Sequence, residues 1–231
     1  MSKNEHLIVT KGLKKVYSDG TIPVQAIRGV DLIIERSEFS TIVGPSGSGK
    51  TTLLNLISGL DRPTEGEVYL NGRLLTSLTG KELSDFRRDH IGFIFQAYNL
   101  IPVLTVEENI EYIMLLQGIS REERHRRIME ILQKVGLSGL ENRKPPQLSG
   151  GQQQRVAIAR AMVSQPSLIL ADEPTANLDS ETGEALLDLM MHLNKSTGMT
   201  FLFSTHDKMV MEKARRIIIL KDGKIAADER K

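Results

Sequence analysis

The chain has 231 residues, and its 30 basic and 29 acidic side chains give a net charge of +1. This balance offers no support for nucleic-acid binding, and the lack of cysteine excludes disulfides and thiolate metal sites and fits a reducing compartment. The length suits one large domain with a real hydrophobic core. The sequence shows no run of 18 apolar residues and no apolar segment at its start, so we expect neither membrane insertion nor a signal peptide.

Residues 7–17 and 24–35 are predicted to form two strands of an N-terminal antiparallel sheet, joined by a turn around Ser18-Asp19-Gly20. Thr105 and Glu108 form a capping box that opens a helix, and a second, charged helix is predicted over 121–135. Other predicted strands lie at 39–43, 91–95, 168–171, 200–204 and 217–220, and one more at 66–72 ends in an Asn-Gly turn; a further helix is predicted at 180–195. Alternating strands and helices favour a mostly parallel, helix-covered sheet with its site at the strand carboxyl ends.

A glycine-rich segment lies between the predicted strand 39–43 and an apolar helix, and it fits the P-loop pattern G-x-x-x-x-G-K-[ST]. Its glycines let backbone N–H groups approach phosphate oxygens, and the following helix N-terminus favours anions. Lys50 can reach the β- and γ-phosphates of ATP, and the Thr51 hydroxyl can ligate Mg²⁺. A flexible Gly/Ser linker is the alternative, which the flanking strand and helix disfavour. The predicted phosphate-binding residues are Gly44, Pro45, Ser46, Gly47, Ser48, Gly49, Lys50, Thr51 and Thr52.

The apolar run 168–171 ends in two carboxylates, Asp172 and Glu173. A buried strand of this kind carries one carboxylate to the phosphate site, where Asp172 would hold Mg²⁺. Glu173 would then polarise the attacking water. An isolated Asp-Glu pair would more simply be a surface turn or a helix cap, but an apolar run ends here and a P-loop lies upstream.

The segment Leu148-Ser149-Gly150-Gly151-Gln152 matches the signature motif of ATP-binding cassette (ABC) ATPases, and the sequence resembles that family over essentially its whole length. The resemblance implies an α/β fold: a P-loop, RecA-like core with an N-terminal antiparallel β subdomain and an inserted α-helical subdomain. In this single domain, about 1–95 and 163–231 would form the core and β subdomain, and about 96–162 the helical subdomain. It also implies a head-to-tail homodimer with two ATP molecules at the interface, in which Ser149, Gly150, Gly151 and Gln152 meet the nucleotide of the opposite subunit.

The resemblance also implies roles for four further residues. Tyr17 would stack on adenine, although a purely structural tyrosine at a strand end is an alternative. Gln96 would sense Mg²⁺ and the attacking water, Asp179 would face the partner subunit, and His206 would contact the γ-phosphate. The predicted catalytic residues are therefore Lys50, Gln96, Glu173 and His206, and the predicted Mg²⁺ ligands are Thr51, Gln96 and Asp172. One departure is Ser37, where the family often has glycine before Glu38.

The segments 59–64, 92–96 and 171–179 look most like those of the lipoprotein-releasing, macrolide-exporter and cell-division group of ABC ATPases. The resemblance implies a cytoplasmic ATPase held at the inner or plasma membrane by integral permease subunits, which would dock on the apolar loop 97–102. That loop could instead pack the helical subdomain onto the core. ABC ATPases of DNA repair carry long coiled-coil or zinc insertions, which the 99 positions from Lys50 to Ser149 and the absence of cysteine do not support. Translation-type ABC ATPases carry two cassettes, and a regulatory ATPase that signals through a membrane partner to cell-envelope enzymes stays open.

Overall fold

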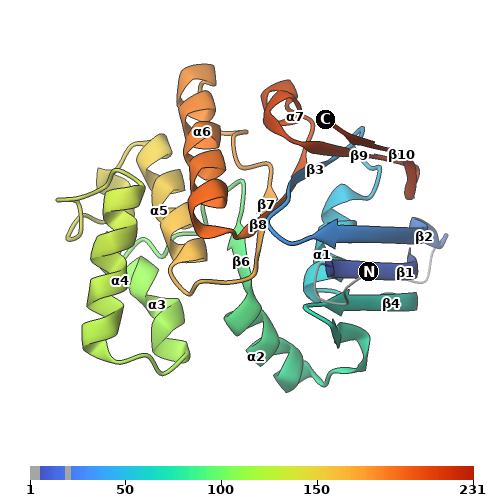
Figure 1. Ribbon diagram of the computed structural model, residues 1–231, viewed down its shortest axis with the longest axis horizontal. Coiled ribbons are helices and arrows are strands. Elements are labelled where there is room, and N and C mark those ends of the chain that lie inside the picture. Colours follow the sequence, from blue (N-terminus) through green and yellow to red (C-terminus); the bar gives the residue numbers. More distant parts are fainter. Residues whose placement is uncertain (1–5, 19–21) are drawn as a thin grey trace.

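The computed structural model describes residues 6–18 and 22–231. Its first sheet has four antiparallel strands in the order β2-β1-β4-β5 (Figure 1), formed by β1 (His6–Tyr17), β2 (Val24–Glu35), β4 (Glu65–Leu70) and β5 (Arg73–Leu74). The predicted N-terminal antiparallel sheet is thus confirmed. Two residues of its predicted turn, Asp19 and Gly20, lie outside the described residues.

The second sheet has six strands in the order β10-β9-β3-β8-β7-β6. They are β3 (Phe39–Val43), β6 (Ile91–Ile94), β7 (Leu168–Asp172), β8 (Thr200–Thr205), β9 (Arg216–Lys221) and β10 (Lys224–Arg230). All neighbouring pairs are parallel except β10 with β9. The carboxyl ends of five parallel strands therefore meet at one edge, as the alternation of strands and helices predicts.

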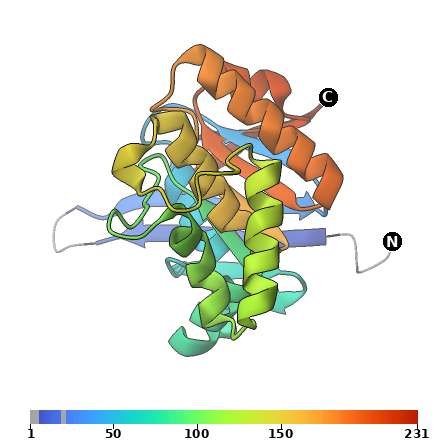
Figure 2. The ribbon, with the colours of Figure 1, turned by 90° about the vertical axis from the view of Figure 1, so that its left-hand side faces the viewer.

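The helices are α1 (Lys50–Ser58), α2 (Gly80–His90), α3 (Val106–Leu116), α4 (Arg121–Lys134), α5 (Gly150–Met162), α6 (Ser180–Thr197) and α7 (Lys208–Lys213), with short 3₁₀ turns at Leu75–Ser77 and Pro145–Gln147. Helices α3, α4 and α5 gather at the end of the molecule far from the antiparallel sheet, as Figures 1 and 2 show. No helix among the described residues is long and apolar enough to cross a membrane.

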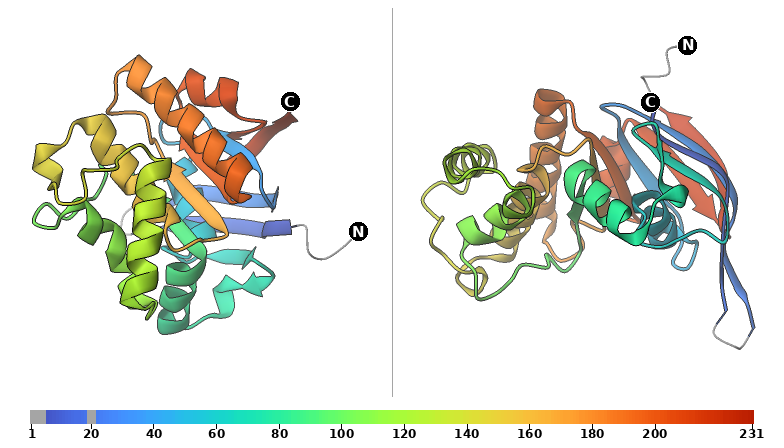
Figure 3. Two further views of the ribbon diagram at one scale, coloured as in Figure 1. Left: turned by 60° about the vertical axis from the view of Figure 1, so that its left-hand side comes forward. Right: turned by 90° about the horizontal axis from the view of Figure 1, so that it is seen from below.

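The parallel sheet has a hydrophobic core on each face, because successive side chains of a strand point to opposite sides. In β8, Phe201 and Phe203 pack with α3–α6, whereas Leu202 packs with α1 and the antiparallel sheet. Figure 3 shows the parallel sheet between helices α3–α6 on one side and α1 with the antiparallel sheet on the other. Because the first core runs without a break from the sheet into α3–α5, packing marks no boundary near residues 96 and 162. Those limits of the helical subdomain stay a prediction.

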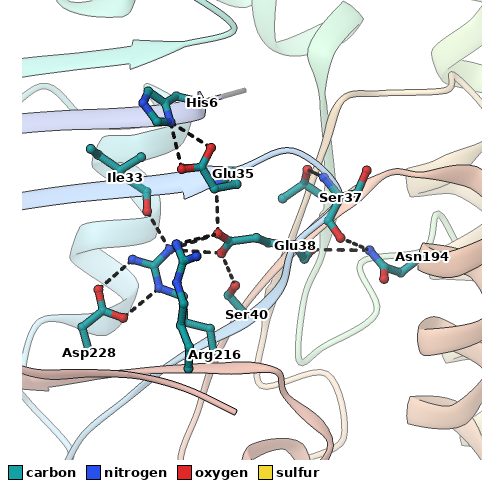
Figure 4. A network of polar contacts seen from close by, with 11 residues as sticks. His6, Ile33, Glu35, Ser37, Glu38, Ser40, Asn194, Arg216 and Asp228 are labelled. Carbon is teal, nitrogen blue, oxygen red and sulfur yellow. Dashed lines mark hydrogen bonds and ion pairs between the residues drawn. The ribbon is translucent and has the colours of Figure 1, made fainter. Parts of the chain in front are cut away.

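A partly buried ionic network joins the two sheets at the end of β3 remote from the P-loop (Figure 4). The Arg216 guanidinium donates to both oxygens of Asp228 at 2.7 Å, to Glu38 at 3.1 Å and to the Ile33 carbonyl at 2.7 Å. These hydrogen bonds from Arg216 hold the pKa of Asp228 below its ordinary value. One arginine thus connects β2, β9, β10 and the start of β3.

The same corner accommodates Ser37, which stands where the family often has glycine. Ser37 has a left-handed φ of 61°, a conformation that glycine adopts at less cost than other residues. Its hydroxyl donates to the Gly198 carbonyl at 2.8 Å, and its N–H donates to the Thr200 hydroxyl at 2.8 Å. These bonds hold serine in the strained turn, at the opposite end of β3 from the P-loop.

Candidate active site

The phosphate-binding loop links the end of β3 to the start of α1. Gly47 and Gly49 have left-handed φ angles of 78° and 102°, which glycine tolerates best. Gly44 differs from these two glycines, because its φ is not left-handed but a Cβ atom there would lie 2.1 Å from the Leu220 carbonyl oxygen. Space, and not the backbone angle, therefore demands glycine at position 44.

A cleft of about 830 Å³ opens over this loop. The Lys50 ammonium lies at its floor and donates to the carbonyls of Gly44 at 2.8 Å and Pro45 at 3.1 Å. The cleft is lined by residues from the P-loop, from the carboxyl ends of the parallel strands and from β2, among them Gln25, Arg28, Pro45, Ser46, Gly47, Gly49, Lys50, Thr51, Thr52, Gln96, Asp172, Glu173, Ser204, His206 and Asp222. The P-loop backbone and the two cationic side chains of this lining, Arg28 and Lys50, suit a polyphosphate.

Two oxygen groups that could hold a cation face each other across this floor. The Thr51 hydroxyl lies 3.1 Å from Asp172 Oδ2, and the Gln96 side chain belongs to the same lining. Among the described residues no group of three or more His, Cys, Asp or Glu side chains gathers to hold a metal alone. A hydroxyl, one carboxylate and an amide are oxygen ligands of the kind Mg²⁺ takes, and Mg²⁺ normally completes its shell with phosphates and water. The residues present therefore fit a nucleotide-bound Mg²⁺.

Glu173 lies directly beyond β7 and is held at both carboxylate oxygens. Oε1 is 2.6 Å from His206 Nδ1, and Oε2 accepts from the Thr205 hydroxyl at 2.8 Å. Its backbone takes a left-handed φ of 47°, with its N–H donating to the Ser204 carbonyl at 2.8 Å. Such a sparsely populated conformation in a non-glycine residue is common at functional sites.

The signature segment lies away from this cleft. Ser149 caps α5, its hydroxyl accepting from the Gln152 N–H at 3.3 Å while the Gln152 side chain accepts from the Ser149 N–H at 2.9 Å. A Cβ atom on Gly151 would lie 2.6 Å from Thr182, and one on Gly150 would lie 3.0 Å from the Tyr98 hydroxyl. None of Ser149, Gly150, Gly151 and Gln152 lines the cleft over the P-loop of the same chain.

Asp179 and Tyr17 also lie off the cleft wall. Asp179 caps α6 by accepting from the Thr182 N–H at 2.9 Å and its hydroxyl at 2.7 Å, and these bonds hold the pKa of Asp179 below its ordinary value. The Tyr17 hydroxyl donates to Asp61 at 2.8 Å, and partial burial together with that bond raises the pKa of Tyr17. The contacts of Asp179 with a partner subunit and of Tyr17 with adenine stay predictions.

The structure adds residues that sequence reasoning missed. Thr205 contacts Glu173, and its only signal was its place directly before His206. Buried Gln154 of α5 donates to the Pro174 carbonyl at 2.6 Å, which ties the signature helix to the residue after Glu173. Asn177 donates to the Gln96 carbonyl at 2.8 Å. No sequence pattern pairs an amide with a carbonyl so far along the chain.

A family model described as "ABC transporter" matches residues 27–176, more than half of the chain. The chain belongs to the ABC transporter family. It is 48% identical over 228 residues to the ABC transporter ATP-binding protein MJ0796 of Methanocaldococcus jannaschii, with 97% of each chain covered. It is 41% identical to the lipoprotein-releasing system ATP-binding protein LolD of Legionella pneumophila, over 98% of this chain and 100% of LolD. It is 44% identical to the macrolide export ATP-binding/permease protein MacB 1 of Aeromonas hydrophila, over 98% of this cassette and 35% of MacB 1.

Two solved structures of MJ0796 agree with the fold of this cassette. A dimeric structure superposes with a TM-score of 0.89 at 47% identity, covering 97% of this chain and 98% of that one. A dimeric post-hydrolysis structure bound to ADP and Pi superposes with a TM-score of 0.88 over the same shares. These comparisons confirm the ABC ATPase fold and the kinship with the lipoprotein-releasing and macrolide-exporter group. The cassette is therefore the ATP-binding, ATP-hydrolysing component of an ABC transporter.

Proposed function

We propose that this cassette hydrolyses MgATP at two composite sites of a head-to-tail homodimer and so drives permease subunits of the lipoprotein-release or export type. One observation carries the composite site. The P-loop, Gln96, Asp172, Glu173 and His206 share one cleft, whereas the signature residues of the same chain lie outside it. The dimeric structures of MJ0796 support the homodimer, and the names of LolD and MacB support the class of membrane partner.

In this proposal the chemistry is mainly positioning and charge stabilisation. Lys50 exchanges its bonds to the Gly44 and Pro45 carbonyls for phosphate oxygens. The partner's α5 offers helix N-terminal N–H groups to the γ-phosphate. Glu173 orients the attacking water and takes up its proton, and His206 turns from Glu173 to the γ-phosphate. Bound Mg²⁺, held by Thr51, Asp172 and Gln96, would neutralise phosphate charge.

A composite site makes activity depend on protein concentration. We expect the ATPase rate per chain to rise with concentration while monomers predominate and to level off once ATP has dimerised them, because neither half-site hydrolyses alone. Measuring initial rates over a wide dilution series, with light scattering to follow dimerisation, checks this. A constant rate per chain across a range in which the protein stays monomeric with ATP would refute the composite site.

We place the docking surface for the permease beside Gln96. A cavity of about 280 Å³ is lined by Phe93, Phe95, Ile101, Tyr112, Ile113 and Arg160, among others. Ile101 is 40% exposed and Val103 is 70% exposed, as suits an apolar contact surface. Leu100 differs, since it packs against the hydrophobic core, so the alternative of internal packing holds for that side chain. A cassette docked in this way would sit at the cytoplasmic face of the membrane.

Charged substitutions on this surface should separate docking from folding. We expect Ile101→Glu and Val103→Asp to leave ATP binding and the melting temperature nearly unchanged and to abolish co-purification with the permease from membranes. Ile33→Glu is the matched control, because Ile33 is also 40% exposed but lies on β2. Equal permease recovery with Ile101→Glu and with Ile33→Glu would contradict the proposed surface.

A further inference from the structure

We propose that Thr205 is a positioning residue for ATP hydrolysis. Its hydroxyl holds Oε2 of Glu173, which leaves Oε1 as the oxygen that orients the attacking water once His206 has turned away. This inference rests on the proposed function, in which Glu173 activates the water. It adds a residue and assigns separate roles to the two carboxylate oxygens.

The direction of the Thr205 hydrogen bond follows from its neighbours. The Thr205 hydroxyl accepts from the Asp207 N–H at 3.0 Å and lies 2.8 Å from Glu173 Oε2. A threonine hydroxyl has one proton, and a backbone N–H can only donate. The proton of Thr205 therefore points at the carboxylate. Asp207 is itself held in place, because its carboxylate accepts from the Thr175 hydroxyl at 2.8 Å and from the Met209 N–H at 2.9 Å.

The two groups that hold Glu173 differ in their freedom to move. Thr205 is fully buried at the end of β8 and pairs with Val43 of β3. His206 lies just beyond the strand, and its side chain is 75% exposed, against 17% for Glu173. His206 can rotate without disturbing the core, whereas Thr205 cannot. When His206 leaves, Oε1 becomes free and Oε2 stays fixed.

Fixing one oxygen matters because the Glu173 side chain ends in a torsion with broad, shallow wells. Its backbone is already set by the left-handed φ and the bond to the Ser204 carbonyl. Without Thr205, the carboxylate would nevertheless turn freely once its bond to His206 is gone. The Thr205 hydroxyl removes this last freedom, so the water is held in line with the γ-phosphate.

Replacing Thr205 by valine removes the hydroxyl and keeps the shape. We expect Thr205→Val to lower kcat by about 10-fold, less than the roughly 100-fold that a 1 Å misplacement of a catalytic group can cost, and to change the KM for ATP by less than about twofold. The ATP-bound dimer should accumulate, because binding survives while hydrolysis slows. Thr205→Ser restores the donor and should return kcat to within about twofold of wild type. A wild-type kcat for Thr205→Val, or a Thr205→Ser enzyme as slow as it, would overturn the inference.

Thr200→Val is the matched control for lost stability. Thr200 is also buried in β8, and its hydroxyl accepts a backbone N–H, from Ser37 at 2.8 Å. It lies five residues from Thr205, about 16 Å along the strand. We expect both valine variants to lower the melting temperature similarly and only Thr205→Val to lower kcat. Equal losses of kcat would overturn the inference. If Thr205→Val does not fold, Thr205→Cys, with its weak S–H donor, replaces it and should show a reduced kcat with unchanged KM.

A double-mutant cycle decides whether Thr205 acts through Glu173. In the Glu173→Gln background we expect Thr205→Val to change the residual rate by less than about twofold, because groups that act as one unit are not additive. The same 10-fold loss in both backgrounds would place the effect elsewhere and overturn the inference. Wild-type turnover of Glu173→Gln alone would instead refute the proposed function, so the two failures are distinguishable.

Discussion

Glu173→Gln lowers the steady-state ATPase rate by about 100-fold or more, the lower range for loss of a positioned general base. The amide keeps the size of the side chain and can still accept from Thr205, but it cannot take a proton from water. Nucleotide binding relies on the P-loop, so ATP affinity should persist and an ATP-bound dimer should accumulate. Phosphate release at saturating ATP measures the rate, and gel filtration with ATP detects the dimer.

The control for this variant is Glu122→Gln, which makes the same chemical change on an exposed position of α4. It should hydrolyse ATP at the wild-type rate and show no trapped dimer. If Glu173→Gln matched this control in turnover, the water-activating group would have to be another residue. Loss of ATP binding together with turnover would point to a misfolded cleft.

Ser149→Arg abolishes hydrolysis and leaves ATP binding by the monomer nearly intact. The arginine side chain fills the space at the N-terminus of α5, which faces the γ-phosphate of the opposite subunit in the proposed dimer. Each chain still has its own P-loop, so affinity for ATP measured at dilutions that keep the protein monomeric should change little. Isothermal titration and an ATPase assay on the same preparation test both statements.

Ser149→Arg also removes the N-cap of α5, which lowers the free energy of unfolding by about 1 kcal/mol and therefore needs a control. Ser120→Arg provides it, because Ser120 caps α4 through a similar bond, from the Glu123 N–H at 3.4 Å. It should destabilise the cassette to a comparable degree and leave hydrolysis unaffected. Mixing Ser149→Arg with Lys50→Ala should restore at most one competent site in each heterodimer. A Ser149→Arg monomer without nucleotide affinity would refute the cross-subunit model.

The sequence predicts those parts of the fold in which local pattern and tertiary role agree. The strands β3, β7 and β8 are almost continuously buried and largely apolar, and the Thr105 capping box is present with both of its hydrogen bonds. The strand β10 was not predicted, because four of its seven residues are charged and it has no apolar run. Helix α2 was also missed, although Thr79 and Glu82 form the same kind of capping box as Thr105 and Glu108.

In the candidate site, too, sequence motifs predict some residues, whereas only the fold reveals the others. Motifs indicate Lys50, Asp172 and Glu173 because each follows or opens an element at a fixed spacing, and the structure gathers these three side chains in the cleft. The partners of these residues have no such spacing. Thr205 meets Glu173 only because β8 lies beside β7 in the sheet, and that neighbourhood is a property of the whole topology.

The order of strands in the parallel sheet has a consequence for how the chain folds during synthesis. The strand β3, which ends in the P-loop, is hydrogen-bonded on one side to β8 and on the other to β9, whose residues are 200–205 and 216–221. Pairings between segments so far apart in sequence form slowly and leave hydrophobic strands exposed in the meantime. A ribosome that has made the P-loop must therefore add more than 150 further residues before that strand has either neighbour. Nascent chains halted before β8 should bind chaperones and no nucleotide.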